Sequence, residues 1–200
     1  MSAMLGTLSC RILLAVPIGE ACARAAGLAS VICPIDEHLG EIEFSVDHVG
    51  VFRSAGRFRH FSGRLALDRA RPERSVVAVD IDAASIDMTW ADALEKLRSP
   101  AYFDVAQFRK IQFRSTGINA TEPGRYQING VLKIRGVAHQ QLLEAVLTDP
   151  GDDGDAAEYV ITGQLSRSAF GMTADRSFVS DIVDVVIVAR IGPDGGAHGR

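Results

Sequence analysis

Alternation of apolar and polar residues dominates the chain from residue 41 onward. In segment 41–49, Ile42, Phe44 and Val46 share one face with His48, and charged residues occupy most of the other face. Successive side chains of a strand point to opposite faces, so this period of two predicts a strand with one buried face. The same kind of pattern recurs in seven more segments, at 56–68, 75–82, 110–116, 125–134, 140–147, 159–167 and 181–191.

The segment 56–68 changes parity in its middle. Phe58 lies between two arginines, whereas Phe61 and Leu65 fall on the opposite parity. A β-bulge adds one residue to a strand and so shifts the alternation by one position. We therefore expect a bulge near His60, which would bring both halves of the segment to the same face.

Residues 90–98 are rich in good helix formers and are followed by Ser99 and Pro100, a pattern typical of one short helix. Eight strands with short connections and no βαβ rhythm favour an antiparallel sheet, which protects its edges in a barrel or a sandwich. We predict an all-β fold, an eight-stranded antiparallel lipocalin-like barrel with this short helix inserted between the third and fourth strands.

The inward positions of this barrel are mainly Val, Ile, Leu, Ala and Phe, and the small Gly130, Ala145 and Gly163 would leave volume beside them. An eight-stranded barrel encloses either packed side chains or one small ligand, and periodicity alone does not separate the two. We expect an apolar cavity. Its predicted lining residues are Phe44, Val46, His48, Val77, Val79, Ile111, Phe113, Ile128, Leu132, Leu143, Ala145, Ile161, Gly163 and Leu165.

The N-terminal stretch differs from this body. An apolar run at 12–18 is followed by small residues, with Ala21 and Ala23 in an A-x-A cleavage pattern, although Pro17 interrupts the run. We expect a signal-like or disordered segment at 1–34, the barrel domain at 35–192 and a flexible tail at 193–200. The protein would be periplasmic or secreted if the signal is used and cytoplasmic otherwise.

Charge and cysteine content narrow the classes of partner. The 200 residues include 21 Lys and Arg against 25 Asp and Glu, a net charge of -4, which argues against a nucleic-acid partner. The three cysteines, Cys10, Cys22 and Cys33, precede the body, so we expect no disulfide or thiolate metal site within it. The apolar runs fall short of the roughly 20 residues that span a bilayer, so no transmembrane helix is expected.

Several runs of the body resemble one known family when they are taken in order. They are IDEHLGEIEFSVDHVGV, GRFRHFSG, IDAASID, LRSPAYFDVAQF, IQFRST, INGVLKIRGV and SRSAFGM. Their order and spacing, from about Asp36 to Ile191, is similar to that of the YceI-like family of lipocalin-like, polyisoprenoid-binding proteins. The resemblance implies a helix-capped antiparallel barrel with one long-chain amphiphile, such as an isoprenoid quinone or a polyprenyl chain, in an apolar channel.

The implied function is non-catalytic binding, storage or transport of an isoprenoid lipid, with no cofactor required. Burial of one five-carbon unit contributes on the order of 3 kcal/mol before ordering costs, so a few units suffice for tight binding. Two alternatives stay open: an enzyme acting on a small apolar substrate, and a partner-binding stress protein. The sequence contains none of the common catalytic motifs, and the outward Val186 and Val188 also suit a homodimer interface.

A few polar residues are candidates for contacts with a lipid head group. The resemblance aligns His38 and His48 with paired histidines of the family, and Arg98 and Arg167 with arginines near helix and strand ends. Each also has a structural alternative, as a hydrogen-bonding, ion-pairing or carbonyl-capping residue. A zinc site that adds His60 to the two histidines is conceivable, but the spacing matches no ligand motif, so we predict neither metal ligands nor catalytic residues.

Overall fold

The computed structural model describes residues 30–50, 52–68, 70–88, 90–151 and 157–192. Residues 1–29 of the predicted signal-like segment 1–34, with Cys10 and Cys22, and the predicted tail lie outside the described residues, whereas residues 30–34 belong to a strand. The described elements are β1 (Ser30–Asp36), β2 (Gly40–His48), β3 (Arg53–Phe58), β4 (Phe61–Asp68), β5 (Val76–Asp82), β6 (Ile86–Met88), α1 (Ala91–Arg98), β7 (Lys110–Glu122), β8 (Arg125–Ile134), β9 (Val137–Asp149), β10 (Ala157–Ser166) and β11 (Val179–Ile191). Three short 3-10 helices occupy Pro72–Arg74, Ala83–Ser85 and Arg167–Phe170.

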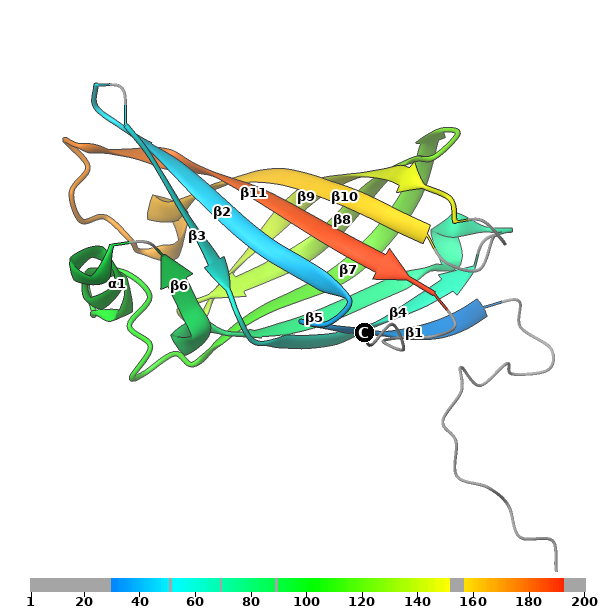
Figure 1. Ribbon diagram of the computed structural model, residues 1–200, viewed down its shortest axis with the longest axis horizontal. Coiled ribbons are helices and arrows are strands. Elements are labelled where there is room, and N and C mark those ends of the chain that lie inside the picture. The colour runs from blue at the N-terminus through cyan, green and yellow to red at the C-terminus, as the bar shows by residue number, and fades with distance from the viewer. Residues whose placement is uncertain (1–29, 51, 69, 89, 152–156, 193–200) are drawn as a thin grey trace, which may run out of the picture.

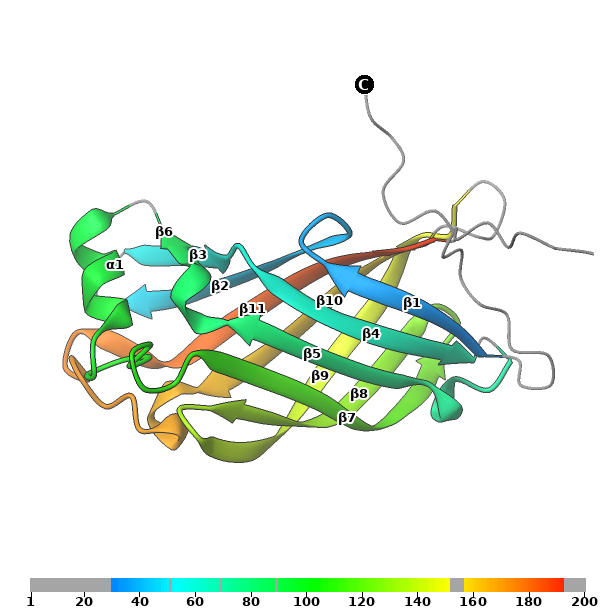
Figure 2. The ribbon, with the colours of Figure 1, turned by 90° about the horizontal axis from the view of Figure 1, so that it is seen from below.

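All eleven strands belong to one antiparallel sheet in the order β1-β4-β5-β7-β8-β9-β10-β11-β2-β3-β6. The sheet curls around a common interior, and α1 lies at one end of its long axis (Figures 1 and 2). Within the described part of the chain, β1 pairs only with β4 and β6 only with β3, so these two strands form the edges of the sheet. The structure confirms an all-β antiparallel fold with one short α-helix.

The predicted closed barrel of eight strands is wrong in its strand count and in its closure. Strand β1 contains Pro34, which lacks the N–H that an inner strand needs and is tolerated at an edge. Strand β6 has only three residues, too few to show alternation. Because β1 and β6 each pair on one side, the interior is enclosed by the curl of an open sheet.

The third additional strand arises at His60, where the predicted bulge is absent. Strand β3 ends at Phe58 and β4 begins at Phe61, and the two pair with different neighbours. The backbone N–H of Arg59 donates to the Ser85 carbonyl at 3.1 Å, and that of Asp82 donates to the His60 carbonyl at 3.0 Å. A break between two strands therefore resets the parity, and both phenylalanines are buried.

The most buried apolar side chains come mainly from the inward faces of strands β2 to β8. They are joined by Phe170, the last residue of the 3-10 helix after β10, and by Met172, which lies between that helix and β11. Leu94 and Leu97 of α1 pack against this cluster, which attaches the helix to one end of the sheet. No helix among the described residues is long and apolar enough to cross a membrane.

Candidate functional site

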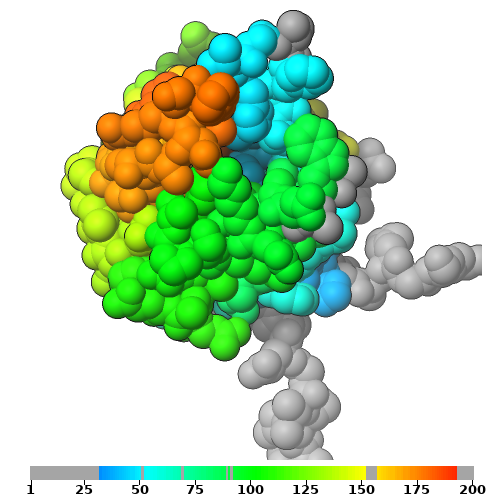
Figure 3. All heavy atoms as spheres, turned by 90° about the vertical axis from the view of Figure 1, so that its left-hand side faces the viewer, coloured from blue at the N-terminus to red at the C-terminus, as the bar shows by residue number. Residues whose placement is uncertain are grey.

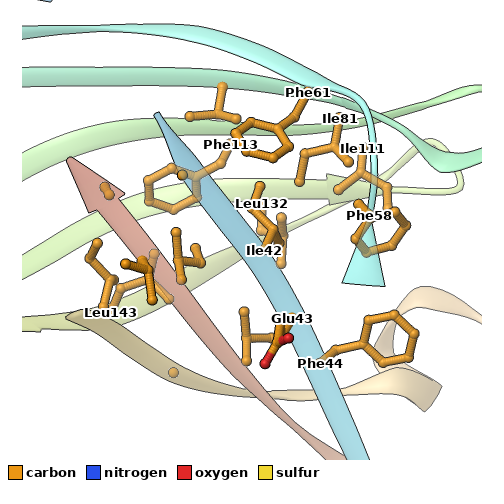
Figure 4. Close-up of a pocket in the computed structure, with 18 of the residues that line it drawn as sticks. Ile42, Glu43, Phe44, Phe58, Phe61, Ile81, Ile111, Phe113, Leu132 and Leu143 are labelled. Atoms are coloured by element: carbon orange, nitrogen blue, oxygen red, sulfur yellow. The ribbon is translucent and has the colours of Figure 1, made fainter. Parts of the chain in front are cut away.

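A cavity of about 960 Å³ runs through the interior of the curled sheet. Figure 4 shows part of its wall, where Phe113, Leu132 and Leu143 point into the same space from β7, β8 and β9. Nearly all of the side chains drawn there carry only carbon, so the wall is apolar. This volume lies near the upper end of the roughly 300–1,000 Å³ typical of ligand pockets.

The residues predicted to line a cavity all lie in this wall. They come from six strands, and inward parity places them there because alternate side chains of each strand face the interior. The wall residues shared by prediction and structure are Phe44, Val46, His48, Val77, Val79, Ile111, Phe113, Ile128, Leu132, Leu143, Ala145, Ile161, Gly163 and Leu165. Their contact with a ligand stays a prediction.

Sequence reasoning missed the part of the wall that loops and the helix supply. Trp90, Leu97 and Phe103 contribute from α1 and its flanks, and Met172 and Phe178 from the segment before β11. These residues lie outside the strands, so no alternation of apolar and polar positions marks them. Only the curl of the sheet brings them to the cavity. An amphipathic pattern in 90–98 was the one available signal for the helical part.

Gly130 does not leave open volume as expected. An ideal Cβ at Gly130 would lie 2.4 Å from Cζ of Phe113 and 2.7 Å from the Arg114 carbonyl oxygen. The Phe113 ring therefore occupies the space above this glycine. Gly163 does line the cavity, but a Cβ there would lie 2.4 Å from Cδ2 of Leu143, so that side chain fills part of the space beside it.

Substitution of Gly130 by Ala is expected to lower the free energy of unfolding by about 1–3 kcal/mol, the usual cost of overpacking. The added methyl meets a ring and a backbone carbonyl, and the carbonyl cannot rotate away. Gly117→Ala is the control, because Gly117 lies on the neighbouring strand β7 with no atom within 4 Å of its ideal Cβ. Urea denaturation of both variants checks this, and equal stabilities would contradict the packing described.

Five polar side chains of the wall lie at the end of the cavity nearest α1. Nε2 of His48 lies 2.8 Å from Oγ of Ser54, across the β2–β3 pair. The Tyr102 hydroxyl donates to Oδ2 of Asp175 at 2.5 Å, and Nζ of Lys96 approaches the same oxygen at 2.6 Å. All five residues line the cavity, so this end offers hydrogen-bonding groups. Other polar residues of the mainly apolar wall lie elsewhere, among them Asp68 and Ser75.

These contacts shift two pKa values in opposite directions. The Lys96 ammonium and then the Tyr102 hydroxyl hold the pKa of the Asp175 carboxyl below its ordinary range. Burial, followed by the hydrogen bond to Asp175, raises the pKa of Tyr102 to about 12. The folded protein therefore favours the neutral phenol and the ionised carboxylate.

The raised pKa of Tyr102 makes stability depend on alkaline pH. Its folded pKa of about 12 exceeds the ordinary 10.0, so its contribution is complete below pH 10 and is lost as the pH rises towards 12. The difference in unfolding free energy between the wild type and Tyr102→Phe should therefore shrink from pH 10 to pH 12. Urea denaturation across that range measures it, and a constant difference would contradict the shift.

The predicted head-group residues occupy different places. Arg167 lines the cavity but is only 3% exposed, and its guanidinium donates to the carbonyls of Met172, Ala174, Val179 and Ser180 at 2.7–3.0 Å. Arg98 lies outside the wall and donates to the carbonyls of two residues near β6. Both arginines thus act as carbonyl-capping residues.

The histidines do not gather into one site. His38 is exposed and outside the wall, where its backbone N–H donates to Asp36 Oδ1 at 2.9 Å. His60 lies on the surface with Nδ1 at 3.4 Å from Oε1 of Glu37, whereas His48 faces the cavity. Within the described ranges, no three His, Cys, Asp or Glu side chains lie close enough together to hold a metal ion.

Comparison with known proteins agrees with this architecture. The model of the YceI-like domain family matches residues 34–191. The UPF0312 protein of Azotobacter vinelandii is 31% identical over 149 residues, which cover 73% of this chain and 78% of that protein. Protein YceI of Salmonella arizonae is likewise 31% identical over 149 residues, with the same shares of 73% and 78%.

Solved structures show the same fold at lower identity. Burkholderia cenocepacia BcnA superposes with a TM-score of 0.70 at 21% identity, over 76% of this chain and 95% of BcnA. A polyisoprenoid binding domain from Saccharophagus degradans gives a TM-score of 0.62 at 12% identity, over 82% of this chain and 98% of that domain. The family match spans nearly the whole curled sheet and the cavity inside it, and this chain therefore belongs to the YceI-like domain family.

Proposed function

We propose that the cavity binds one isoprenoid lipid, a polyprenyl chain or an isoprenoid quinone, and that the protein stores or carries it without chemical change. The observation that supports this most strongly is a mainly apolar interior of about 960 Å³ with a group of hydrogen-bonding side chains at the end nearest α1. The similar structure from Saccharophagus degradans is a polyisoprenoid binding domain, which supports the same ligand class.

The apolar wall supplies the affinity. Each buried methylene contributes about 0.8 kcal/mol, so a tail of several isoprene units gains enough to offset the cost of ordering the ligand. The wall offers a large apolar contact to such a tail, because Val, Ile, Leu and Phe side chains from many strands line it.

The polar groups near α1 supply the orientation. His48, Ser54 and Lys96 line the cavity there, and a quinone carbonyl or a hydroxyl head group could exchange hydrogen bonds with them. Arg167 already donates four of its five N–H groups to backbone carbonyls and contributes little to this role. The head group would therefore lie near α1, with the tail extending along the sheet.

Native mass spectrometry of the full chain purified from a bacterial host tests this proposal. We expect a protein species with one bound lipid, whose fragmentation shows a repeating five-carbon tail. After the lipid is removed with detergent, the protein should take up added ubiquinone or polyprenol at a ratio of one to one. A lipid-free protein that takes up neither compound would overturn the proposal.

A matched comparison separates isoprenoid binding from the binding of any apolar chain. The delipidated protein is offered a polyprenol and a saturated straight-chain alcohol of the same carbon number. Preference for the polyprenol supports the isoprenoid class, and equal uptake would contradict it.

We also propose that the protein is periplasmic or secreted, because residues 12–23 have the pattern of a secretory signal. Fractionation of the native host tests that location, and recovery of the protein only from the cytoplasm would contradict it.

A further inference from the structure

Three large apolar side chains project into solvent close together at one end of the molecule. Val49 and Phe52, in the connection between β2 and β3, are 73% and 71% exposed, and Phe178, before β11, is 69% exposed. The Val49 N–H donates to the Phe178 carbonyl at 2.9 Å, which joins the two segments. We call Val49, Phe52 and Phe178 the apolar tip.

The apolar tip adjoins one mouth of the cavity. Phe178 belongs to both the tip and the cavity wall, and Trp90, which is 57% exposed and precedes α1, also lines the cavity. Figure 3 looks at this end and shows the β2–β3 connection in cyan, the segment before β11 in orange and the α1 region in green around a recess. Exposed apolar side chains therefore border the end of the cavity where its hydrogen-bonding groups lie.

We propose that the apolar tip and Trp90 dock on a lipid bilayer, so that an isoprenoid passes between the membrane and the cavity without crossing water. The proposal rests on the lipid-binding function above. A long isoprenoid tail dissolves in bilayers, and its transfer into water is unfavourable in proportion to the apolar surface that becomes exposed. When the apolar tip and Trp90 insert into the membrane, the tail can enter the cavity without this exposure to water.

The local chemistry suits a membrane interface. Aromatic side chains are favoured at the boundary between lipid and water, and amphipathic surfaces bury their apolar face there. The His48 N–H donates to the Phe52 carbonyl at 2.8 Å, so this backbone already has internal partners. Two nearby cations are also paired, because Arg53 contacts Asp47 and Asp184, and Lys96 contacts Asp175.

Vesicles of pure phosphatidylcholine test the docking with the full-length protein. Trp90 is the sole tryptophan of the chain, so its emission reports on the rim directly. We expect a blue shift when vesicles are added, and quenching when the lipids carry bromine on their acyl chains. We also expect the protein to float with the vesicles in a density gradient.

The double variant Val49→Ser/Phe52→Ser should bind these vesicles at least tenfold more weakly and exchange lipid with them correspondingly more slowly. Neither residue lines the cavity, so uptake of ubiquinone from detergent should be unchanged. The matched control is Val76→Ser/Leu142→Ser, since these exposed side chains lie on the outer wall of β5 and β9. The control should bind vesicles as the wild type does.

Several outcomes would overturn the docking. They are a wild type that does not bind vesicles, a tip variant that binds them as well as the wild type, a control that loses binding equally, and binding to membranes only when they contain protein. Uptake of ubiquinone from detergent is measured separately and tests the lipid-binding function. A protein that takes up ubiquinone from detergent but does not bind vesicles therefore refutes the docking and leaves the lipid-binding function standing.

Discussion

An Ala145→Phe variant is expected to bind isoprenoid lipid at least tenfold more weakly than the wild type while keeping its fold. Ala145 of β9 lies between Tyr126 of β8 and Ile161 of β10, and all three residues line the cavity. A phenyl ring at this position would enter the space of about 960 Å³ that we assign to the lipid. The ring and the tail would then compete for the same volume.

Stability of the same variant distinguishes a ligand cavity from a packed core. Overpacking of a filled core costs about 1–3 kcal/mol, whereas a ring that enters open space should shift the melting temperature by only a few degrees. Ala138→Phe is the control, because Ala138 is exposed on the same strand outside the cavity wall. Ala145 is preferred to Gly163, where a new side chain would first displace Leu143.

Melting temperature and lipid occupancy are measured on the Ala145→Phe and Ala138→Phe proteins side by side. Loss of lipid from Ala145→Phe alone, with little change in melting temperature, is the expected pattern. Full lipid occupancy together with a large loss of stability would show that Ala145 faces a packed core and that the lipid binds elsewhere.

Arg167→Met should lower the free energy of unfolding by about 3–5 kcal/mol, a large share of the 5–15 kcal/mol typical of a folded domain. The guanidinium donates to four backbone carbonyls between Met172 and Ser180 and is almost fully buried. Methionine fills similar volume but donates nothing, so several carbonyls would lose their partner. A buried acceptor without a partner costs about 1–3 kcal/mol.

Arg98→Met is the matched control for this prediction. Arg98 also donates to two backbone carbonyls, but it is exposed, so water replaces the lost hydrogen bonds and we expect a loss of less than about 1 kcal/mol. Urea denaturation of both variants, with Arg167→Lys as a test of partial rescue, provides the comparison. Equal small losses for Arg167→Met and Arg98→Met would mean that the segment before β11 is stabilised by other contacts.

The sequence by itself determined which side chains face the interior. Alternation is a local property, because each residue of a strand turns its side chain to the face opposite that of its neighbour. Val77, Phe113 and Ile161 could therefore be assigned to the cavity wall from spacing alone, and the structure places all three there. The helix was equally readable, since 90–98 predicts what α1 forms at Ala91–Arg98.

The tertiary structure alone decided where strands end, which strands pair, and where the interior has open volume. The break at His60 depends on which strands lie beside β3 and β4, and parity looks the same for a break and for a bulge. Whether Gly130 opens volume depends on Phe113, a residue of the neighbouring strand whose ring lies over it.

The functional end of the cavity was also beyond the reach of local pattern. Tyr102 and Asp175 are 73 positions apart and meet only because the curl brings the loop after α1 next to the segment before β11. The same curl joins Val49 to Phe178 through a backbone hydrogen bond, and both side chains are exposed although composition would assign them to a core. Period and parity fix the direction of a side chain, but contacts between distant segments depend on the closure of long loops in space, which no local pattern encodes.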